Sequence, residues 1–357
     1  MAGDHEITVL STACVEGKES GVRYLRFKSP GSPIVKRGLF FGRLLYLLSR
    51  FYVIYDKLCC DYGERHRLKS VEADLVFVED CTLLPLAWYL KRTRGVPVVF
   101  DAREYFPRHF EDSLFWKIFF RGYFRYLCRQ YLRRCDRVIS VGSHIARTYT
   151  KNYGVPVSLY MSLPEYAELS PGAVDPEHVK ILYHGNCTPA RKIENLISMI
   201  SLLPEQYKLY LVLVNVNNKY FAQIRGLARQ EKRVHILDPV PYGDIEAFSN
   251  RFDIGMLLFP DTTFNLKYCL PNKLFQYLQS RLLLATGPSP ELARIVRQYK
   301  CGVVGDDYTA EAVAHAIRGL SVEDITAMKK NADTAARELH LEKNRSILNG
   351  ILESLPA

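Results

Sequence analysis

The segment Asn265–Tyr299 constrains the fold more than any other part of this 357-residue chain, because it joins several elements in a fixed order. Pro271 follows a loop and precedes an amphipathic run, and proline is favoured in the first turn of a helix. The apolar run 282–286 resembles a strand buried on both faces, and Gly287 and Pro288 end it before a second helix. Helix, buried strand and helix form the repeating unit of a parallel α/β sheet, so the segment predicts that fold class.

The start of the first of these helices is a predicted anion site. The first N–H groups of a helix have no partner within the helix and carry the positive end of its dipole. Lys273 lies in that first turn. Open α/β sheets bind their ligands at the carboxyl ends of their strands, and Thr286 marks such an end nearby. A bound phosphate group fits both features.

Short apolar runs alternate with amphipathic runs through both halves of the chain, as in a doubly wound sheet. Residues 161–177 are rich in proline and acidic side chains without periodicity, which is typical of a linker. We therefore expect an α/β protein with two Rossmann-like, doubly wound parallel-sheet domains that face a central cleft. The expected bounds are 1–165 for the first domain and 166–340 for the second. A C-terminal helix, 341–357, is expected to pack back on the first domain.

Composition predicts a globular cytoplasmic protein. No apolar stretch approaches the roughly 20 residues that span a bilayer. The amino terminus also lacks the basic and then apolar pattern of a secretory signal. Nine scattered cysteines without a CxxC pair favour neither a disulfide framework nor a zinc site. We expect no metal site and no cofactor.

The net charge of +10 is unevenly distributed. Residues 105–135 hold seven basic and two acidic side chains, which account for half of the excess. Five of the basic residues recur at every fourth position among bulky apolar side chains, which predicts one helix with a cationic stripe: Lys117, Arg121, Arg125, Arg129 and Arg133. Such a helix suits the inner face of the cytoplasmic membrane as a peripheral contact. The alternatives are the solvated face of an ordinary covering helix, a lipid diphosphate site, or a nucleic-acid site.

Three runs of this chain resemble the family 4 glycosyltransferases of the GT-B fold. They are VPVVFDAREYFP, ILYHGNCTPARKIENLI and PNKLFQYLQSRLLLATGPSPELARIV. The chain departs from the family pattern at three positions. Gln276 replaces a glutamate that holds the donor ribose, Arg281 replaces a glycine, and Arg103 replaces a histidine of the cleft. Glutamine can still bond to a diol, but it lacks the charge of a carboxylate.

The resemblance implies that the second domain binds a nucleotide diphosphate sugar as the donor substrate. The residues implied are Gly185, Arg191, Lys192, Val240, Tyr242, Leu270, Asn272, Lys273 and Gln276. We expect a helix to start near Ala190, with Arg191 and Lys192 in its first turn. Cations there oppose the helix dipole and favour a bound diphosphate. Backbone contacts at Val240 and Tyr242 leave the choice between uracil and guanine open.

Asp101, Arg103 and Glu104 follow the carboxyl end of an expected strand, and we assign them to the catalytic face of the cleft. Arginine cannot act as a general base, but its planar fork can bind a diphosphate or an acidic sugar. The alternative is a solvated Arg–Glu pair on a surface loop.

The function predicted is glycosyl transfer from a UDP- or GDP-sugar to a membrane-associated saccharide or lipid-linked acceptor. By resemblance, the reaction retains the anomeric configuration without an obligatory metal and serves the synthesis of envelope lipopolysaccharide or polysaccharide. An epimerase or hydrolase of sugar nucleotides on the same frame is an alternative. A basic nucleic-acid-binding protein is another, although we expect no nucleic acid as partner.

Overall fold

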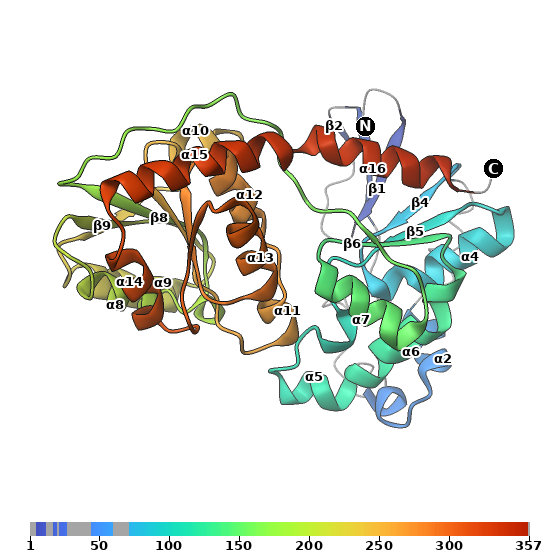
Figure 1. Ribbon diagram of the computed structural model, residues 1–357. Coiled ribbons are helices and arrows are strands. Elements are labelled where there is room, and N and C mark those ends of the chain that lie inside the picture. Colours follow the sequence, from blue (N-terminus) through green and yellow to red (C-terminus); the bar gives the residue numbers. More distant parts are fainter. Residues whose placement is uncertain (1–4, 12–16, 20, 27–43, 60–70, 356–357) are drawn as a thin grey trace.

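The computed structural model describes residues 5–11, 17–19, 21–26, 44–59 and 71–355, without the side chains of residues 56–59. Two α/β domains lie side by side and are joined by an extended segment (Figure 1). The predicted fold class, with two Rossmann-like domains, is confirmed. The strands are β1 (Ile7–Ser11), β2 (Gly17–Glu19), β3 (Val22–Arg26), β4 (Val76–Val78), β5 (Val98–Asp101), β6 (Arg137–Ser140), β7 (Ser158–Leu159), β8 (Val179–Cys187), β9 (Tyr207–Asn215), β10 (Val234–Leu237), β11 (Ile254–Leu257), β12 (Leu283–Thr286) and β13 (Gly302–Val304).

The helices cover the sheets and connect their strands. Those of the first domain are α2 (Tyr52–Cys59), α4 (Leu84–Arg94), α5 (Leu114–Phe119), α6 (Arg121–Tyr131) and α7 (Ser143–Tyr153). Those that follow are α8 (Glu194–Ser201), α9 (Asn218–Ala228), α10 (Ile245–Ser249), α11 (Phe264–Lys267), α12 (Asn272–Gln279), α13 (Pro290–Tyr299), α14 (Ala310–Arg318), α15 (Val322–Glu338) and α16 (Leu341–Glu353).

The second domain contains a six-stranded parallel sheet in the order β10-β9-β8-β11-β12-β13. Alternate side chains of β8 enter different cores. Ile181 and Tyr183 pack with the helices α8, α9 and α14, whereas Leu182 packs with α12 and α13. Every residue of β12 is buried, as its continuous apolar run predicts. The sheet is therefore covered on both faces.

The first domain contains a four-stranded parallel sheet, β4-β5-β6-β7. The described N-terminal strands form a second, three-stranded sheet in which β2 runs antiparallel to β3. Phe100, Leu127 and Tyr149 are fully buried in the core between the parallel sheet and helices α6 and α7. This core fixes the carboxyl end of β5, where Asp101 lies.

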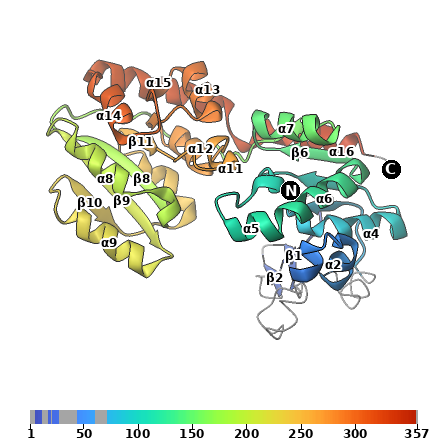
Figure 2. The ribbon, with the colours of Figure 1, turned by 90° about the horizontal axis from the view of Figure 1, so that it is seen from below.

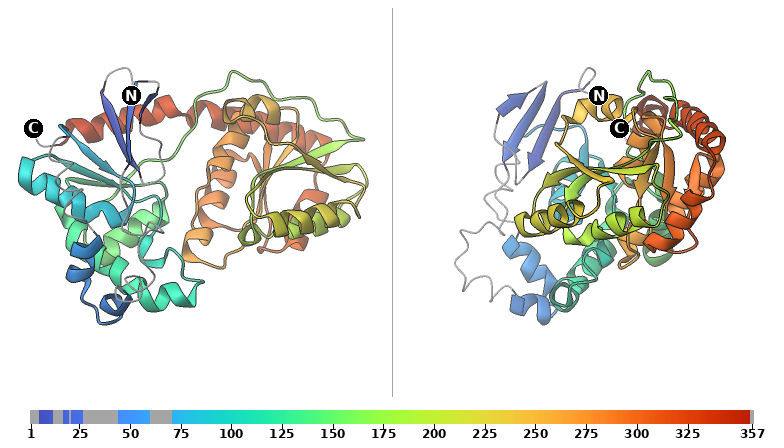
Figure 3. Two further views of the ribbon diagram at one scale, coloured as in Figure 1. Left: turned by 180° about the vertical axis from the view of Figure 1, so that it is seen from behind. Right: turned by 90° about the vertical axis from the view of Figure 1, so that its left-hand side faces the viewer.

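Helix α16 returns from the second domain to the first (Figure 3). Ile351 packs against Val99 and Ile139 of the first sheet. The guanidinium of Arg137 donates a 2.8 Å hydrogen bond to the carbonyl of Ser354. The last helix thus joins the two domains, and it begins beside the connecting segment, where the N–H of Leu341 donates to the carbonyl of Pro164 at 2.7 Å.

The expected single basic helix is two helices. Helix α5 ends at Phe119, and α6 begins at Arg121 with Phe120 between them. Arg133 lies beyond α6 in a 3-10 turn, Leu132–Arg134. Trp116 of α5 and Tyr123 of α6 are both buried.

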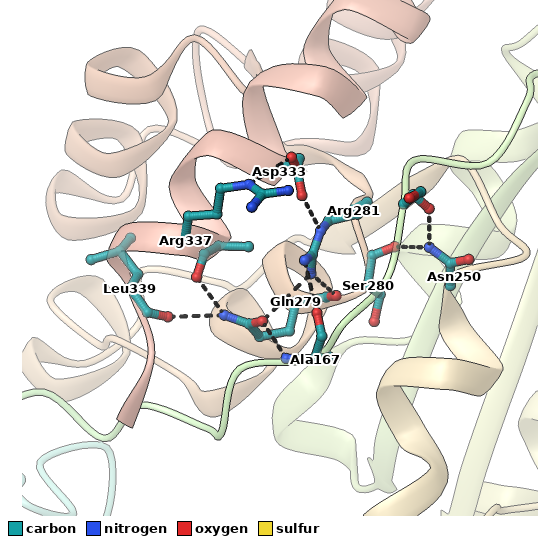
Figure 4. Close-up of polar contacts among 10 residues, drawn as sticks. Ala167, Asn250, Gln279, Ser280, Arg281, Asp333, Arg337 and Leu339 are labelled. Carbon is teal, nitrogen blue, oxygen red and sulfur yellow. Dashed lines mark hydrogen bonds and ion pairs between the residues drawn. The ribbon is translucent and has the colours of Figure 1, made fainter. Parts of the chain in front are cut away.

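Arg281 shows how the chain accommodates a residue where the resembled family has glycine. Its φ of +59° is in the left-handed region, which favours glycine. The side chain is fully buried: Nε lies 2.6 Å from Oδ1 of Asp333, and a terminal nitrogen donates to the carbonyl of Ala167 at 2.8 Å (Figure 4). The amide of Gln279 accepts from the N–H of Ala167 at 3.0 Å. Arg281 therefore fastens the connecting segment to the second domain.

Candidate functional site

Two cations and two aromatic rings of the second domain pack together and form a group termed the cationic pocket: Lys273, Arg191, Tyr183 and Phe259. Lys273 is in the first turn of α12, whose N-cap residue is Pro271; the prediction that Pro271 is within the helix is off by one residue. The Nζ of Lys273 lies 4.0 Å from the ring centre of Tyr183 and 5.7 Å from that of Phe259. Gly185 makes room for this side chain, because a Cβ at that position would lie 2.7 Å from Nζ.

Arg191 joins the same pocket from the loop after β8. Its guanidinium carbon lies 5.1 Å from the ring centre of Phe259. The predicted helix start near Ala190 is wrong: Pro189–Arg191 form a 3-10 turn, Lys192 has a φ of +51°, and α8 begins at Glu194. An acidic residue in the first turn suits a helix dipole, whereas the two cations do not. The side chain of Lys192 is exposed.

The two cations of this pocket are held close together without a counter-charge. Burial, and then the neighbouring Arg191, lower the pKa of Lys273 to about 7. In the part of the chain that the structure describes, neither Lys273 nor Arg191 has a carboxylate within ion-pair distance. A bound anion would stabilise both cations.

Two polar groups beside Lys273 lack partners. The Tyr183 hydroxyl and Nε2 of His184 are buried and form no hydrogen bond within the described residues. Burial, and then Lys273, lower the pKa of His184 to about 3, so its ring is neutral. Burial raises the pKa of the Cys269 thiol to about 12 in the loop before α12. Buried polar groups without partners are rare in folded proteins, so these two make the pocket a candidate site for a polar ligand.

A small cavity of about 30 Å³ lies along α12 from this pocket. It is lined by Ser162, Leu163, Pro164, Tyr242, Asn272 and Gln276. Three of these residues, Tyr242, Asn272 and Gln276, belong to the predicted donor site, so the structure brings them together. Gln276 is 4% exposed, and its side chain is hydrogen-bonded to Glu246 of α10, a carboxylate whose pKa burial raises. Val240 is partly buried two residues before Tyr242, and Leu270 packs into the core of the domain.

The predicted catalytic residues of the first domain separate into two groups. Arg103 is paired twice: its Nε lies 2.8 Å from Asp101, and a terminal nitrogen lies 2.7 Å from Glu79. Asp101 is 2% exposed, and burial raises its pKa against the opposing effect of Arg103. The carboxylate of Glu104 lies 3.2 Å from Nε2 of His109. Of the three residues, Glu104 lies close enough to Cys269 to raise the pKa of that thiol.

Helix α11 brings the loop of Glu104 to the donor side. The side-chain oxygen Oδ1 of Asn265 accepts a 2.8 Å hydrogen bond from the backbone N–H of Tyr105. The Phe264 ring lies 5.2 Å from that of Tyr105. Sequence reasoning did not identify Asn265, Tyr183, Phe259 or Cys269 as site residues. Each lies near the end of a strand or in the segment before α12, and that position was the only signal that could have identified them.

The predicted cationic surface lies on α5, on α6 and on the 3-10 turn after α6, and α5 is at the edge of the first domain toward the second (Figure 2). All five basic side chains of this surface are exposed, and within the described residues none pairs with a carboxylate. Arg133 also donates to the carbonyl of Tyr153 at 3.0 Å. Four large apolar residues are exposed beside them: Phe110, Leu114, Phe115 and Ile118. Trp116 and Leu127, expected to add to this surface, are buried instead.

The described residues contain neither a metal-ligand cluster nor a membrane-spanning helix. Among these residues, no group of three or more histidine, cysteine and acidic side chains is placed to hold a metal ion. None of the helices within the described ranges combines the length and the apolar composition needed to cross a bilayer.

Comparisons with known proteins agree with this architecture. The sequence model of Glycosyltransferase Family 4 matches residues 2–159. Sucrose-phosphate synthase from Thermosynechococcus elongatus is 13% identical, with a TM-score of 0.72 over 99% of this chain and 89% of that one. HepE from Anabaena, in complex with UDP and glucose, is 11% identical, with a TM-score of 0.67 over 94% and 87%. WaaG, a glycosyltransferase involved in lipopolysaccharide biosynthesis, is 13% identical, with a TM-score of 0.64 over 95% and 90%.

No curated protein sequence matches the chain significantly. The match to the family covers most of the first domain, and the likeness in fold covers nearly the whole chain. The chain has the GT-B fold of these glycosyltransferases, and residues 2–159 match the Glycosyltransferase Family 4 model.

Proposed function

We propose that this protein is a glycosyltransferase that transfers a sugar from a nucleotide diphosphate sugar, a UDP- or GDP-sugar, to a membrane-associated saccharide or lipid-linked acceptor. The reaction retains the anomeric configuration, needs no metal and serves envelope glycan synthesis. The enzyme acts on the inner face of the cytoplasmic membrane as a peripheral protein.

The cationic pocket carries this proposal. Lys273 and Arg191 lie beside each other on aromatic rings without a carboxylate partner among the described residues. The neighbouring Tyr183 hydroxyl and His184 Nε2 have no partner there either. A diphosphate would supply negative charge to both cations and acceptors to the orphaned donor groups. The complex of HepE with UDP and glucose supports this choice of ligand, because that protein shares the fold.

The geometry also suggests how bond cleavage is assisted. Negative charge develops on the leaving diphosphate as the bond to the sugar breaks. Lys273, Arg191 and the N–H groups at the start of α12 are fixed beside that position and need little reorganisation, which is the arrangement that stabilises a developing charge. The acceptor proton passes to an oxygen of the leaving phosphate, so no carboxylate nucleophile is required. Glu104 then lies across the cleft as a contact for the sugar or the acceptor.

The nucleoside end of the donor extends from this pocket along α12. Gln276 follows Lys273 by three residues, so the two side chains lie on the same side of the helix. Gln276 and Tyr242 both line the small cavity there. We assign the ribose to Gln276 and the base to the loop of Val240 and Tyr242.

The exposed surface of α5 and α6 supports a membrane-bound acceptor. Cationic side chains attract anionic headgroups, and each contributes on the order of 1 kcal/mol near an anionic leaflet. The apolar side chains of Leu114, Phe115 and Ile118 are 69%, 48% and 53% exposed, and they can enter the interface between headgroups and acyl chains. The likeness in fold to WaaG agrees with an acceptor of the envelope.

Thermal unfolding with a panel of UDP-, GDP-, CMP- and dTDP-sugars tests the donor. A ligand at 100 times its dissociation constant adds roughly 2.7 kcal/mol of stability, which gives a clear shift in Tm. We expect one base to give that shift. Release of free sugar or an epimer without acceptor would instead favour the hydrolase or epimerase, and no shift with any nucleotide would contradict the donor assignment.

Sedimentation with vesicles tests the membrane surface. We expect binding to anionic but not to neutral vesicles, and weaker binding as salt shortens the Debye length below about 10 Å. Replacement of Arg121, Arg125 and Arg129 together by Gln should release the protein while transfer to a short water-soluble acceptor survives. Equal partition to both kinds of vesicle would mean that α5 and α6 are ordinary covering helices.

A further inference from the structure

A buried carboxylate of the second domain caps a helix of the first. The Glu291 side chain is 0% exposed. Its Oε1 accepts from the Ser143 hydroxyl at 2.7 Å and from the N–H of His144 at 2.8 Å, and the His144 Nδ1 lies 2.8 Å from the same oxygen. Burial alone would raise the pKa of Glu291, but the hydrogen bonds from Ser143 and His144 outweigh it and hold the pKa below its ordinary value. The carboxylate is therefore charged at neutral pH.

The position of this carboxylate matters because two helix N-termini meet there. Glu291 is in the first turn of α13, and its partners are in the first turn of α7, which lies in the other domain (Figure 1). Each helix start carries partial positive charge, so the two repel each other. Helix α7 has no side-chain cap of its own, because Gly142 occupies its N-cap position. Glu291 offsets the charge of both helix starts at once.

Two further contacts lie along this seam, where α7 of the first domain meets α11 and α13 of the second. The Ser289 hydroxyl, at the N-cap of α13, donates to the carbonyl of Lys267 at 2.7 Å, which ties α13 to α11. The Tyr268 ring stacks on that of His144 with centres 4.7 Å apart. Tyr268 directly precedes Cys269 and the loop to Lys273. The position of α7 is thus transmitted to the cationic pocket through a short stretch of bonded chain.

We propose that Glu291 is an interdomain latch, a positioning residue that holds the first domain against α11 and α13 and so places Glu104 opposite the cationic pocket. Asn265 holds the Tyr105 backbone of the same loop, at the other end of the seam. Without Glu291, two uncompensated helix starts face each other and the domains separate. Donor binding, which uses the second domain alone, persists, whereas transfer to the acceptor slows. The kinetic consequence rests on the proposed function, but the separation of the domains does not.

Small-angle X-ray scattering of the full-length protein tests the latch directly. The wild type should scatter as the arrangement in Figure 1 predicts, and Glu291→Gln should show a larger radius of gyration. Glu311→Gln is the matched control, because Glu311 is also in the first turn of a helix of the second domain but is exposed. The double variant Ser143→Ala/His144→Ala weakens the latch from the first domain and should expand the protein as well, so the test stands even if Glu291→Gln fails to fold.

Kinetic measurements distinguish a positioning role of Glu291 from a role in stability alone. In Glu291→Gln we expect the affinity for UDP, measured by calorimetry, to stay within about threefold of wild type, while transfer to the acceptor falls about tenfold or more. An unchanged radius of gyration in the folded variants would overturn the latch, as would equal losses in donor affinity and transfer. Failure of the wild type to bind any nucleotide would instead contradict the proposed function, and the scattering result would still decide the latch.

Discussion

The cations on the two sides of the cleft differ in what surrounds them. Arg103 of the first domain is paired with both Asp101 and Glu79, so its charge is already compensated. Lys273 and Arg191 of the second domain rest on aromatic rings, with no carboxylate partner in the described residues. In sequence, these residues look alike, since each follows the end of a predicted strand or starts a helix. The structure distinguishes a cation that is paired within its own domain from two cations that have no carboxylate partner among the described residues.

The largest effect is expected on UDP affinity when a cation of the second domain is removed. Arg191→Ala should weaken UDP binding about 30- to 100-fold, because a hydrogen bond to a charged group contributes about 1.5–3 kcal/mol. Arg103→Ala should change it less than about threefold, because that cation is satisfied within its own domain. Calorimetric titration of both variants measures the difference. Similar losses in the two would erase the distinction between the two sides.

A third cation, Arg281, allows the contribution of a buried, paired charge to the free energy of unfolding to be measured. Arg281→Gly should destabilise the protein by about 2 kcal/mol, because Asp333 loses a buried partner although it keeps some exposure to water. The UDP affinity should not change. Arg337→Ala is the matched control, since Arg337 pairs with the same carboxylate but is 64% exposed and should cost under about 1 kcal/mol. Urea denaturation gives both values, and a loss of UDP binding in Arg281→Gly would contradict its structural role.

The depressed pKa of Lys273 makes donor binding depend on pH. The free protein loses this proton as pH rises through about 7, and only the charged amine attracts the diphosphate. UDP affinity should therefore fall about tenfold from pH 7 to 8.5, with proton uptake on binding. Calorimetry in buffers of different ionisation enthalpy measures this uptake. Lys273→Met should abolish the pH dependence in this range, and a persistent dependence would assign it to another group.

The smallest expected effect concerns Gln276. Gln276→Glu would restore the carboxylate of the resembled family and should preserve or tighten donor binding. The nearby Glu246 opposes this gain, because two carboxylates at one site disfavour each other's charge. We expect a change of less than about threefold in UDP affinity. A loss of more than about tenfold, roughly 1.4 kcal/mol, would mean that the amide makes a contact that a carboxylate cannot.

The parts of this molecule that sequence could predict were those set by local patterns. The apolar run of β12 and the loop before α12 identified a parallel sheet and the place of Lys273. Contacts between distant segments could not be read in the same way. The pairing of Arg103 with Glu79 joins residues 24 apart, and the contact of Glu291 with His144 joins residues 147 apart. Such partners depend on how the domains pack, which periodicity does not encode.

The boundaries of short elements were also missed, for identifiable reasons. Sequence periodicity treated residues 117–133 as one helix, but α5 ends at Phe119 and α6 begins at Arg121. The start of α8 was placed too early because Pro189 begins a 3-10 turn instead of the helix itself. Periodicity indicates which face of a helix is apolar, but it does not locate the residue at which a helix starts or ends.

The central claim is that Lys273 and Arg191 form a diphosphate site, and titration of inorganic diphosphate into wild type and Lys273→Met tests it most directly. Methionine has a similar volume and no charge, so the fold and the rings of Tyr183 and Phe259 should remain in place. The wild type should bind diphosphate and UDP, and the variant should bind each at least about tenfold more weakly, at unchanged Tm. Equal affinity of the two proteins for both ligands would contradict the account.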